Sequence, residues 1–272
     1  MQKFLIAILL AAFLMPAAVH ADDPWDILND QERIAVDSIL AHWETWMPAL
    51  KADGTAPLLT WEKLYDGLDA SQRAFLDRLR TVDPKASFDF QGDQLGGDRE
   101  GVRMKRLDDQ KILKNGSPEP LPPQYLPWEV YEAFQSMMQA MEKDLGVRLL
   151  VDSGYRSHAY QLYTFLFYTP KHHYSLVETG HWVALPGFSE HGAPHRQAID
   201  FINQNGVNGE DRVEDFEELP EYDWLLRNAS AHGFELSYPR GVPGITFEPW
   251  HWHYTRGTTP AVEEESLIPA AS

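Results

Sequence analysis

The chain has 272 residues, with 41 acidic and 23 basic side chains and a formal net charge of -18 at pH 7. So acidic a chain without a basic tail is a poor binder of polyanions, which argues against nucleic acid as a partner. It contains no cysteine. Disulfides and a lipid-modified cysteine are therefore excluded, and the fold must be held by its hydrophobic core or by a metal.

Residues 1–21 are typical of a secretory signal peptide. Lys3 gives a positive start, residues 4–15 form an apolar segment, and small residues surround a cleavage position after Ala21. The apolar segment is too short to span a bilayer comfortably, which favours cleavage over a permanent anchor. We expect an exported protein, periplasmic or secreted, with no stable membrane anchor after cleavage.

Residues 22–119 predict a helical extension followed by an irregular connection. Apolar residues recur at helical spacing over 35–47 and 71–82, and Asp69 or Ser71 is placed to cap the second helix. Residues 83–123 are rich in Gly, Asp and Pro and predict a long connection that partly wraps the next domain.

Residues 120–257 differ in their sequence pattern from the preceding residues and predict a second domain, followed by a flexible tail over 258–272. We expect helices and short strands in turn: helices over 128–146 (ending at Gly146), 158–168 and around 222–233, strands over 149–151 and around Asp200, and a closing pair of strands, FELSYP and ITFEPWHWHYT. Helices segregate from strands, which indicates an α+β fold with a small antiparallel sheet flanked by helices.

Two stretches of this domain gather metal-binding residue types. Asp200 lies inside an apparently buried strand, where a carboxylate is costly unless it is paired or bound to a cation, and His191 and His195 precede it. The stretch EPWHWHY adds Glu248, His251 and His253, and the two histidines, two positions apart, would point to the same face of an extended strand. Imidazole and carboxylate are common Zn²⁺ ligands where thiols are absent, and two histidines with one aspartate leave a fourth position open, as in catalytic zinc sites.

A third stretch, SGYRS, places Arg156 at a strand-to-helix turn, where its guanidinium can face an anion. Together SGYRSHAYQ, PGFSEH…AID and EPWHWHY resemble, in the same order, the motifs of zinc D-alanyl-D-alanine carboxypeptidases of the VanY type, within the LAS metallopeptidase group. The resemblance covers roughly residues 120–257 and leaves 22–119 unexplained.

The resemblance implies a role for each matching residue. His191, Asp200 and His251 would be zinc ligands, Glu248 the general base, and Arg156 the group that stabilises the oxyanion. Three further residues would line the pocket for a terminal D-Ala: Ser189, Tyr155 and Gln161. The substrate implied is a peptidoglycan stem peptide ending in D-Ala-D-Ala.

The sequence departs from the VanY-type pattern S-x-H-x-x-G-x-A-x-D, because its segment between His191 and Asp200 is two residues longer and has Arg196 at the Gly position. His195 is therefore an alternative ligand to His191. The pattern also has an arginine where His253 stands, so a second alternative makes His253 the ligand and His251 the base.

Three functions remain open at this point. The first is a zinc DD-carboxypeptidase that removes the terminal D-Ala. The second is a dipeptidase or an endopeptidase of the same group, which depends on the length of the pocket. The third is a protein that binds wall peptides without cutting them, because its longer loop spoils the metal site.

Overall fold

The computed structural model describes residues 26–87, 90, 92–96, 102–193, 195–242 and 246–255. The predicted signal peptide (1–21) and the predicted tail (258–272) lie outside these residues. Within the described part of the chain, no helix combines the length and the apolar character that crossing a membrane requires.

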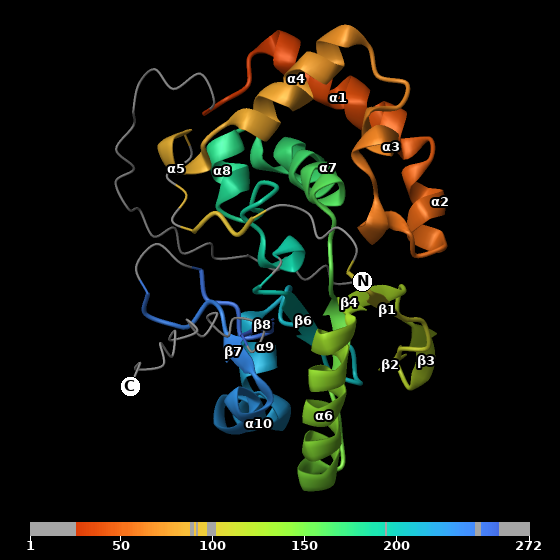
Figure 1. Ribbon diagram of the computed structural model, residues 1–272, viewed down its shortest axis with the longest axis vertical. Helices are drawn as coiled ribbons and strands as arrows, with labels where there is room; N and C mark the ends of the chain where they lie inside the picture. Colours follow the sequence, from red (N-terminus) through yellow and green to blue (C-terminus); the bar gives the residue numbers. More distant parts are fainter. Residues whose placement is uncertain are drawn as a thin grey trace, which may run out of the picture.

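The first 62 of these residues, 26–87, form a layer of short helices that we call the N-terminal layer. Its elements are α1 (Asp30–Glu44), α2 (Met47–Ala52), η1 (Ala56–Leu58), α3 (Trp61–Tyr65), α4 (Ala70–Thr81) and α5 (Pro84–Ser87). Capping boxes at Asn29 and Asp69 set the starts of α1 and α4, and Asp69 was one of the two predicted caps. In Figure 1 the layer arches over α7.

The prediction of an irregular connection over 83–123 is wrong in part. That stretch holds three short strands, β1 (Met104–Leu107), β2 (Lys111–Lys114) and β3 (Ser117–Pro120). β1 pairs with β4 (Gln124–Pro127), and β2 pairs with β3, both antiparallel. The β2–β3 turn is Asn115-Gly116 with positive φ at both residues, the turn type that joins two-residue hairpins.

The second half follows the predicted order closely. Its helices are α6 (Trp128–Leu145), α7 (His158–Tyr168), η2 (Thr169–His172), α8 (Leu176–Gly180), η3 (Glu190–Gly192), α9 (Val213–Glu217), α10 (Pro220–Asn228) and η4 (Ala229–His232). Its strands are β5 (Leu150–Ser153), β6 (Ala198–Ile202), β7 (Phe234–Leu236) and β8 (His251–Tyr254). Gly146 ends α6 in the left-handed conformation, φ 73°, as the predicted helix end requires.

The four strands of this half form one antiparallel sheet in the order β5-β6-β8-β7. One face of it packs against α6 and α10 in an apolar cluster that we call the sheet core. It includes Phe134 of α6, Phe201 of β6 and Trp252 of β8 (Figure 1). Helices around a small antiparallel sheet confirm the predicted α+β fold.

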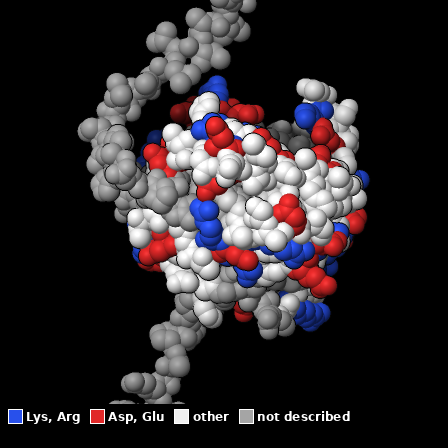
Figure 2. Space-filling model, turned by 90° about the horizontal axis from the view of Figure 1, so that it is seen from above, with Lys and Arg blue, Asp and Glu red and all other residues white. Residues whose placement is uncertain are grey.

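The face seen from above, across the N-terminal layer, carries acidic and basic side chains interspersed (Figure 2). Ion pairs in that layer, such as Arg78 with Glu32 and Lys63 with Asp66, account for part of the mixture. Exposed pairs of this kind contribute little to stability, and the layer is held instead by its apolar underside.

Candidate active site

Strand alternation explains why polar residues gather on the second face of the sheet. Asp200 on β6 pairs with His251 on β8, and successive side chains of a strand point to opposite faces. Phe201 and Trp252 therefore enter the sheet core, whereas Asp200 and His251 point the other way. The expected buried strand around Asp200 and the expected common face of His251 and His253 are both confirmed.

The structure brings His191, Asp200 and His251 into one cluster, in which their ligand atoms lie within 4.8 Å of one another. Nε2 of His191 is 3.0 Å from Oδ2 of Asp200, and Nδ1 of His251 is 2.8 Å from Oδ1. All three side chains are largely shielded from solvent. The predicted set of three therefore shares one location, which is what a metal site requires.

Two glycines allow close packing beside this cluster: Gly154 brings the turn before α7 against β4, and Gly192 interlocks the η3 turn with that same turn. A Cβ on Gly154 would collide with the carbonyl of Tyr125, and one on Gly192 would lie 2.9 Å from the carbonyl oxygen of Arg156. The close approach lets Nδ1 of His191 bond the carbonyl of Gly154 at 2.8 Å. That bond leaves Nε2 of His191 to face Asp200, so the ring presents one chosen nitrogen to the cluster.

The electrostatics of the cluster differ sharply between its two imidazoles. Burial and the nearby Arg156 lower the pKa of His191 to about 4, so this ring is neutral at pH 7. Burial opposes the charge on His251, but Asp200 and Glu190 outweigh it and raise that pKa to about 10. Burial likewise opposes ionisation of Asp200, yet the two histidines hold its pKa well below the usual range.

The donor set fits a zinc ion by its chemistry. Two imidazole nitrogens and a carboxylate form a three-residue set of the kind found in catalytic zinc sites. Oδ1 of Asp200 is buried and has no hydrogen-bond partner among the described residues, so its approach to His251 is a close contact without hydrogen-bond geometry. A buried oxygen without a donor is satisfied when a cation takes that place.

Glu248 and Arg156 lie on either side of the cluster. Oε2 of Glu248 is 3.7 Å from Nδ1 of His251, and Nη2 of Arg156 is 3.5 Å from Oδ2 of Asp200. Burial raises the pKa of Glu248 to about 7, against the opposing charge of His251. A carboxyl group with that pKa can both take and give a proton near neutral pH.

The three predicted pocket residues are all buried near Arg156, but they do not act alike. Gln161 orients Arg156, because its Oε1 accepts from Nη1 at 3.3 Å while its Nε2 donates to the carbonyl of Ala184. Tyr155 is 5% exposed and Ser189 is 9% exposed. Both flank the interlocked turns, Tyr155 before Arg156 and Ser189 before η3.

The two alternative ligands are not part of the cluster of three. His195 is exposed on the loop before β6. His253 is buried on β8, but its Nδ1 contacts Ser237 at 2.7 Å and lies 3.8 Å from Oε1 of Glu190. The geometry therefore favours His191 and His251 over these alternatives.

Comparison with known proteins points to one family. The family model described as VanY, D-alanyl-D-alanine carboxypeptidase, matches residues 123–257. The bifunctional D-Ala-D-Ala dipeptidase and D-Ala-D-Ala carboxypeptidase VanXYC of Enterococcus gallinarum is 30% identical over 138 residues, which cover 48% of this chain and 67% of that protein. The chain belongs to the VanY family.

Other relatives match a smaller share of their own length. YodJ of Bacillus subtilis is 32% identical over 50% of this chain and 48% of its own, and a D-alanyl-D-alanine carboxypeptidase of Enterococcus faecalis is 33% identical over 44% of each. The chain thus spans about half the length of these two relatives. Among solved structures, the LdcB LD-carboxypeptidase is 30% identical, with a TM-score of 0.42 over 48% of this chain and 59% of that one.

The longer loop of this VanY-family chain is accommodated by side chains that the sequence did not single out. Glu190, between Ser189 and His191, is 5% exposed and contacts His251, Ser237 and Arg196. A second missed residue is Tyr238, whose ring centroid lies 4.8 Å from that of His251. An acid between two predicted site residues was the available signal for Glu190, whereas Tyr238 had none.

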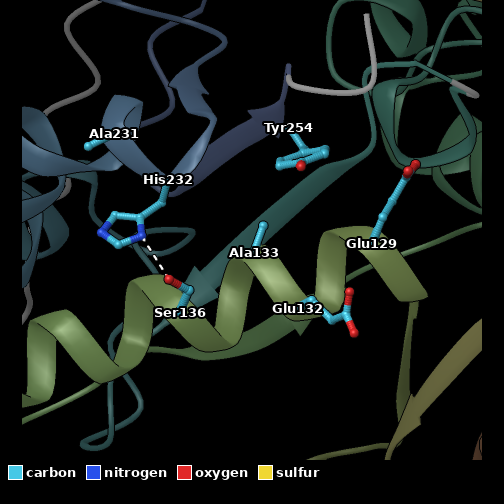
Figure 3. Close-up of a pocket in the computed structure, with 7 residues that line it drawn as sticks. All are labelled: Glu129, Glu132, Ala133, Ser136, Ala231, His232 and Tyr254. Atoms are coloured by element: carbon cyan, nitrogen blue, oxygen red, sulfur yellow. Dashed lines mark hydrogen bonds between the residues drawn. The ribbon is translucent and has the colours of Figure 1, made fainter.

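A separate pocket of about 460 Å³ lies on the α6 side of the sheet (Figure 3). Glu132 and Ser136 of α6 face it from one side and His232 of η4 from the other, where Ser136 and His232 are hydrogen-bonded at 3.2 Å. Tyr254 of β8 lines it as well, on the face opposite to His251 and His253. The sheet therefore separates this pocket from the cluster of His191, Asp200 and His251.

Proposed function

We propose that the chain is a zinc-dependent DD-carboxypeptidase, which hydrolyses the peptide bond before the terminal D-Ala of peptidoglycan stem peptides. The observation that carries the proposal is the convergence of His191, Asp200 and His251 on one point, with Glu248 and Arg156 beside it. Two relatives named for D-Ala-D-Ala cleavage support the choice of substrate.

The zinc ion is assigned to Nε2 of His191, Nδ1 of His251 and the carboxylate of Asp200. The neutral state of His191 suits a ligand, and the proton that His251 carries at Nδ1 without metal is the one that binding would displace. A zinc ion with an open position lowers the pKa of a water molecule and polarises a carbonyl group.

Glu248 is assigned the proton transfers. Its carboxylate takes a proton from the attacking water as the water oxygen bonds to the carbonyl carbon, and it then gives that proton to the leaving amine as the C–N bond breaks. Its pKa of about 7 suits both steps. Arg156, fixed by Ser153 and Gln161, presents its guanidinium to the negative charge that develops on the carbonyl oxygen.

The substrate side of the proposal uses the buried residues next to Arg156. Tyr155 and Ser189 are assigned to the pocket for the terminal D-Ala, and Gln161 to holding Arg156 in place. A wall peptide as substrate requires export, for which the proposed signal is residues 1–21, cleaved to leave a periplasmic or secreted enzyme.

The test uses the mature chain, a defined pentapeptide ending in D-Ala-D-Ala, and the variant Glu248→Gln. We expect about one zinc ion per chain, release of D-alanine, and a fall in kcat of about 10²–10⁴-fold in the variant with zinc retained. Glu178→Gln, an exposed change on α8, is the matched control and keeps full activity.

Product masses decide between the members of the group. Free D-alanine supports the proposal. D-Ala-D-Ala dipeptide among the products would show that the enzyme cleaves a different peptide bond of the substrate. Unchanged activity of Glu248→Gln, or a wild-type chain that takes up no zinc, would contradict the proposed mechanism.

A further inference from the structure

Glu190 is a buried carboxylate that the proposed reaction does not use. Its side chain is 5% exposed, yet each of its oxygens is engaged by hydrogen-bond donors. Oε2 lies 2.9 Å from Nε2 of His251 and accepts from Oγ of Ser237 at 2.5 Å. Oε1 accepts from Nε and Nη2 of Arg196 at 3.0 and 2.6 Å. So complete a set of partners stabilises a charge that burial alone would penalise.

The contact of Glu190 with His251 decides which nitrogen of that ring faces Asp200. A carboxylate can only accept, so Nε2 of His251 donates to Glu190 and Nδ1 is left as the atom toward Asp200. Carboxylates that hold the far side of a metal-binding imidazole fix its orientation and raise its strength as a ligand. Glu190 stands in that relation to His251.

Two side chains flank the same oxygen of Glu190 from different elements. Arg196 reaches Oε1 of Glu190 from the loop before β6. His253 approaches it from β8, with its Nδ1 3.8 Å from Oε1. These are the two positions at which the sequence departs from the VanY-type pattern, with Arg196 where a glycine stands and His253 where an arginine stands. Both departures therefore meet at one carboxylate.

We propose that Glu190 is a positioning residue for His251, and that Arg196 supplies from the longer loop the counter-charge that an arginine at position 253 would supply from β8. The loop insertion then preserves the metal site instead of spoiling it. The inference rests on the proposed function, because it takes His251 to bind zinc.

The experiment measures zinc affinity of the full mature chain by competition with a chromophoric chelator, beside thermal unfolding of the metal-free protein. Glu190→Gln keeps the shape and an acceptor oxygen but removes the charge, and Glu190→Ala removes both. We expect zinc binding to weaken by about 10-fold in the first and by up to about 100-fold in the second. If Glu190→Ala does not fold, Glu190→Gln decides.

The counter-charge is tested by a rescue. Arg196→Gln should weaken zinc binding by several-fold, and the double variant R196Q/H253R should restore most of the loss, because the side chain at position 253 already comes within 3.8 Å of Oε1 of Glu190. Arg212→Gln, which breaks an exposed pair with Asp215, is the matched control and keeps wild-type affinity.

The outcomes separate this inference from the proposed function. A wild-type chain that binds no zinc overturns both. If the wild type binds zinc and releases D-alanine while Glu190→Gln binds zinc as tightly, only the role of Glu190 is overturned. If Arg196→Gln has wild-type affinity, or the double variant binds zinc no better than the single one, the role of Arg196 is overturned. A purely structural role would lower the unfolding temperature without changing zinc affinity in the chains that remain folded.

Discussion

The molecule has two hydrophobic cores that differ in origin. The sheet core draws its buried residues from Leu126 to Trp252, all within the part that matches the VanY family. The second, which we call the N-terminal core, joins the N-terminal layer to α7 and α8, so that Trp43 and Ile39 share one cluster with Leu162 and Phe165. More than half of the buried residues of this second core therefore lie outside the family match.

The candidate active site lies where the two cores meet, and each supports a different part of it. Asp200 and His251 belong to strands whose other face is the sheet core. Arg156 lies in the turn before α7 and Gln161 in the first turn of α7. This end of the helix is tied to the N-terminal layer because Ser157 donates from its N–H to the carbonyl of Pro57 at 2.8 Å. The sheet core thus supports the candidate metal ligands Asp200 and His251, and the N-terminal core supports Arg156 and Gln161, which we assign to the substrate side.

The largest expected effect comes from removing the N-terminal layer. A chain that begins at residue 102 would expose the side chains of Leu162, Phe165 and Leu166, which are now fully buried. Exposing each costs about 1.5–3 kcal/mol, against a total stability of about 5–15 kcal/mol. We expect an aggregated product without a cooperative thermal transition, as seen by circular dichroism and gel filtration. A monomer that unfolds cooperatively would show that the two cores are independent.

Single truncations in each core sharpen the comparison. Trp43→Ala and Phe201→Ala should each cost about 3–5 kcal/mol in free energy of unfolding, because both side chains are fully buried. Their effects on the site should differ. Phe201 follows Asp200 on β6 and stacks on Phe134, so its loss should weaken zinc binding about 10-fold.

Trp43→Ala serves as the counterpart in that experiment. It should leave the zinc dissociation constant of the folded protein within about twofold of wild type, since no sheet residue contacts its cluster among the buried residues described. Denaturant unfolding gives the stabilities, and chelator competition gives the affinities. Equal losses of zinc affinity in both variants would contradict the division between the cores.

A smaller effect is expected at the cap of α7. Oγ of Ser157 accepts from the N–H of Tyr160 and donates to the carbonyl of Leu59 at 2.6 Å, inside the buried interface. Ser157→Ala removes both bonds, which should cost about 1–2 kcal/mol and lower kcat/KM without changing zinc affinity. Ser175→Ala, which removes the cap of α8, is the matched control. It should lose similar stability and keep kcat/KM, and a fall in kcat/KM there would undo the assignment.

The sequence was sufficient for the parts of this site that depend on strand alternation and motif order. The antiparallel sheet and the shared face of His251 and His253 follow from periods of two. The closeness of Asp200 to His191 and His251 was an expectation from the order of the motifs that resemble the VanY type. The partners of Glu190 did not follow, because Arg196 and Ser237 reach it from segments whose approach depends on tertiary packing. The packing of the N-terminal layer against α7 could not be predicted for the same reason. An amphipathic pattern shows which face of a helix is buried but does not identify the element that covers it.

The smallest expected effect lies at the bulge of β5, the strand that contributes Val151 to the sheet core. The register shifts between Val151 and Ser153, which leaves Asp152 out of the strand pairing. Burial raises the pKa of Asp152 above its ordinary 3.8, although Nδ2 of Asn208 donates to its Oδ2 at 2.9 Å. A carboxyl group whose pKa is higher in the folded state binds its proton more tightly there, so its ionisation favours the unfolded chain. Stability is therefore lost as the pH rises from 3.8 through the raised pKa, and the loss is complete above it.

Asp152→Asn keeps an acceptor for Asn208 and removes the titration. We expect the variant to be more stable than wild type at pH 7 and the difference to shrink as the pH falls below 3.8, where the wild-type carboxyl is protonated in both states. Urea unfolding at a series of pH values measures this, with the exposed change Asp109→Asn as the control for losing one negative charge. A variant that is less stable than wild type at pH 7 would mean that attraction to Arg156 stabilises the Asp152 carboxylate by more than burial destabilises it.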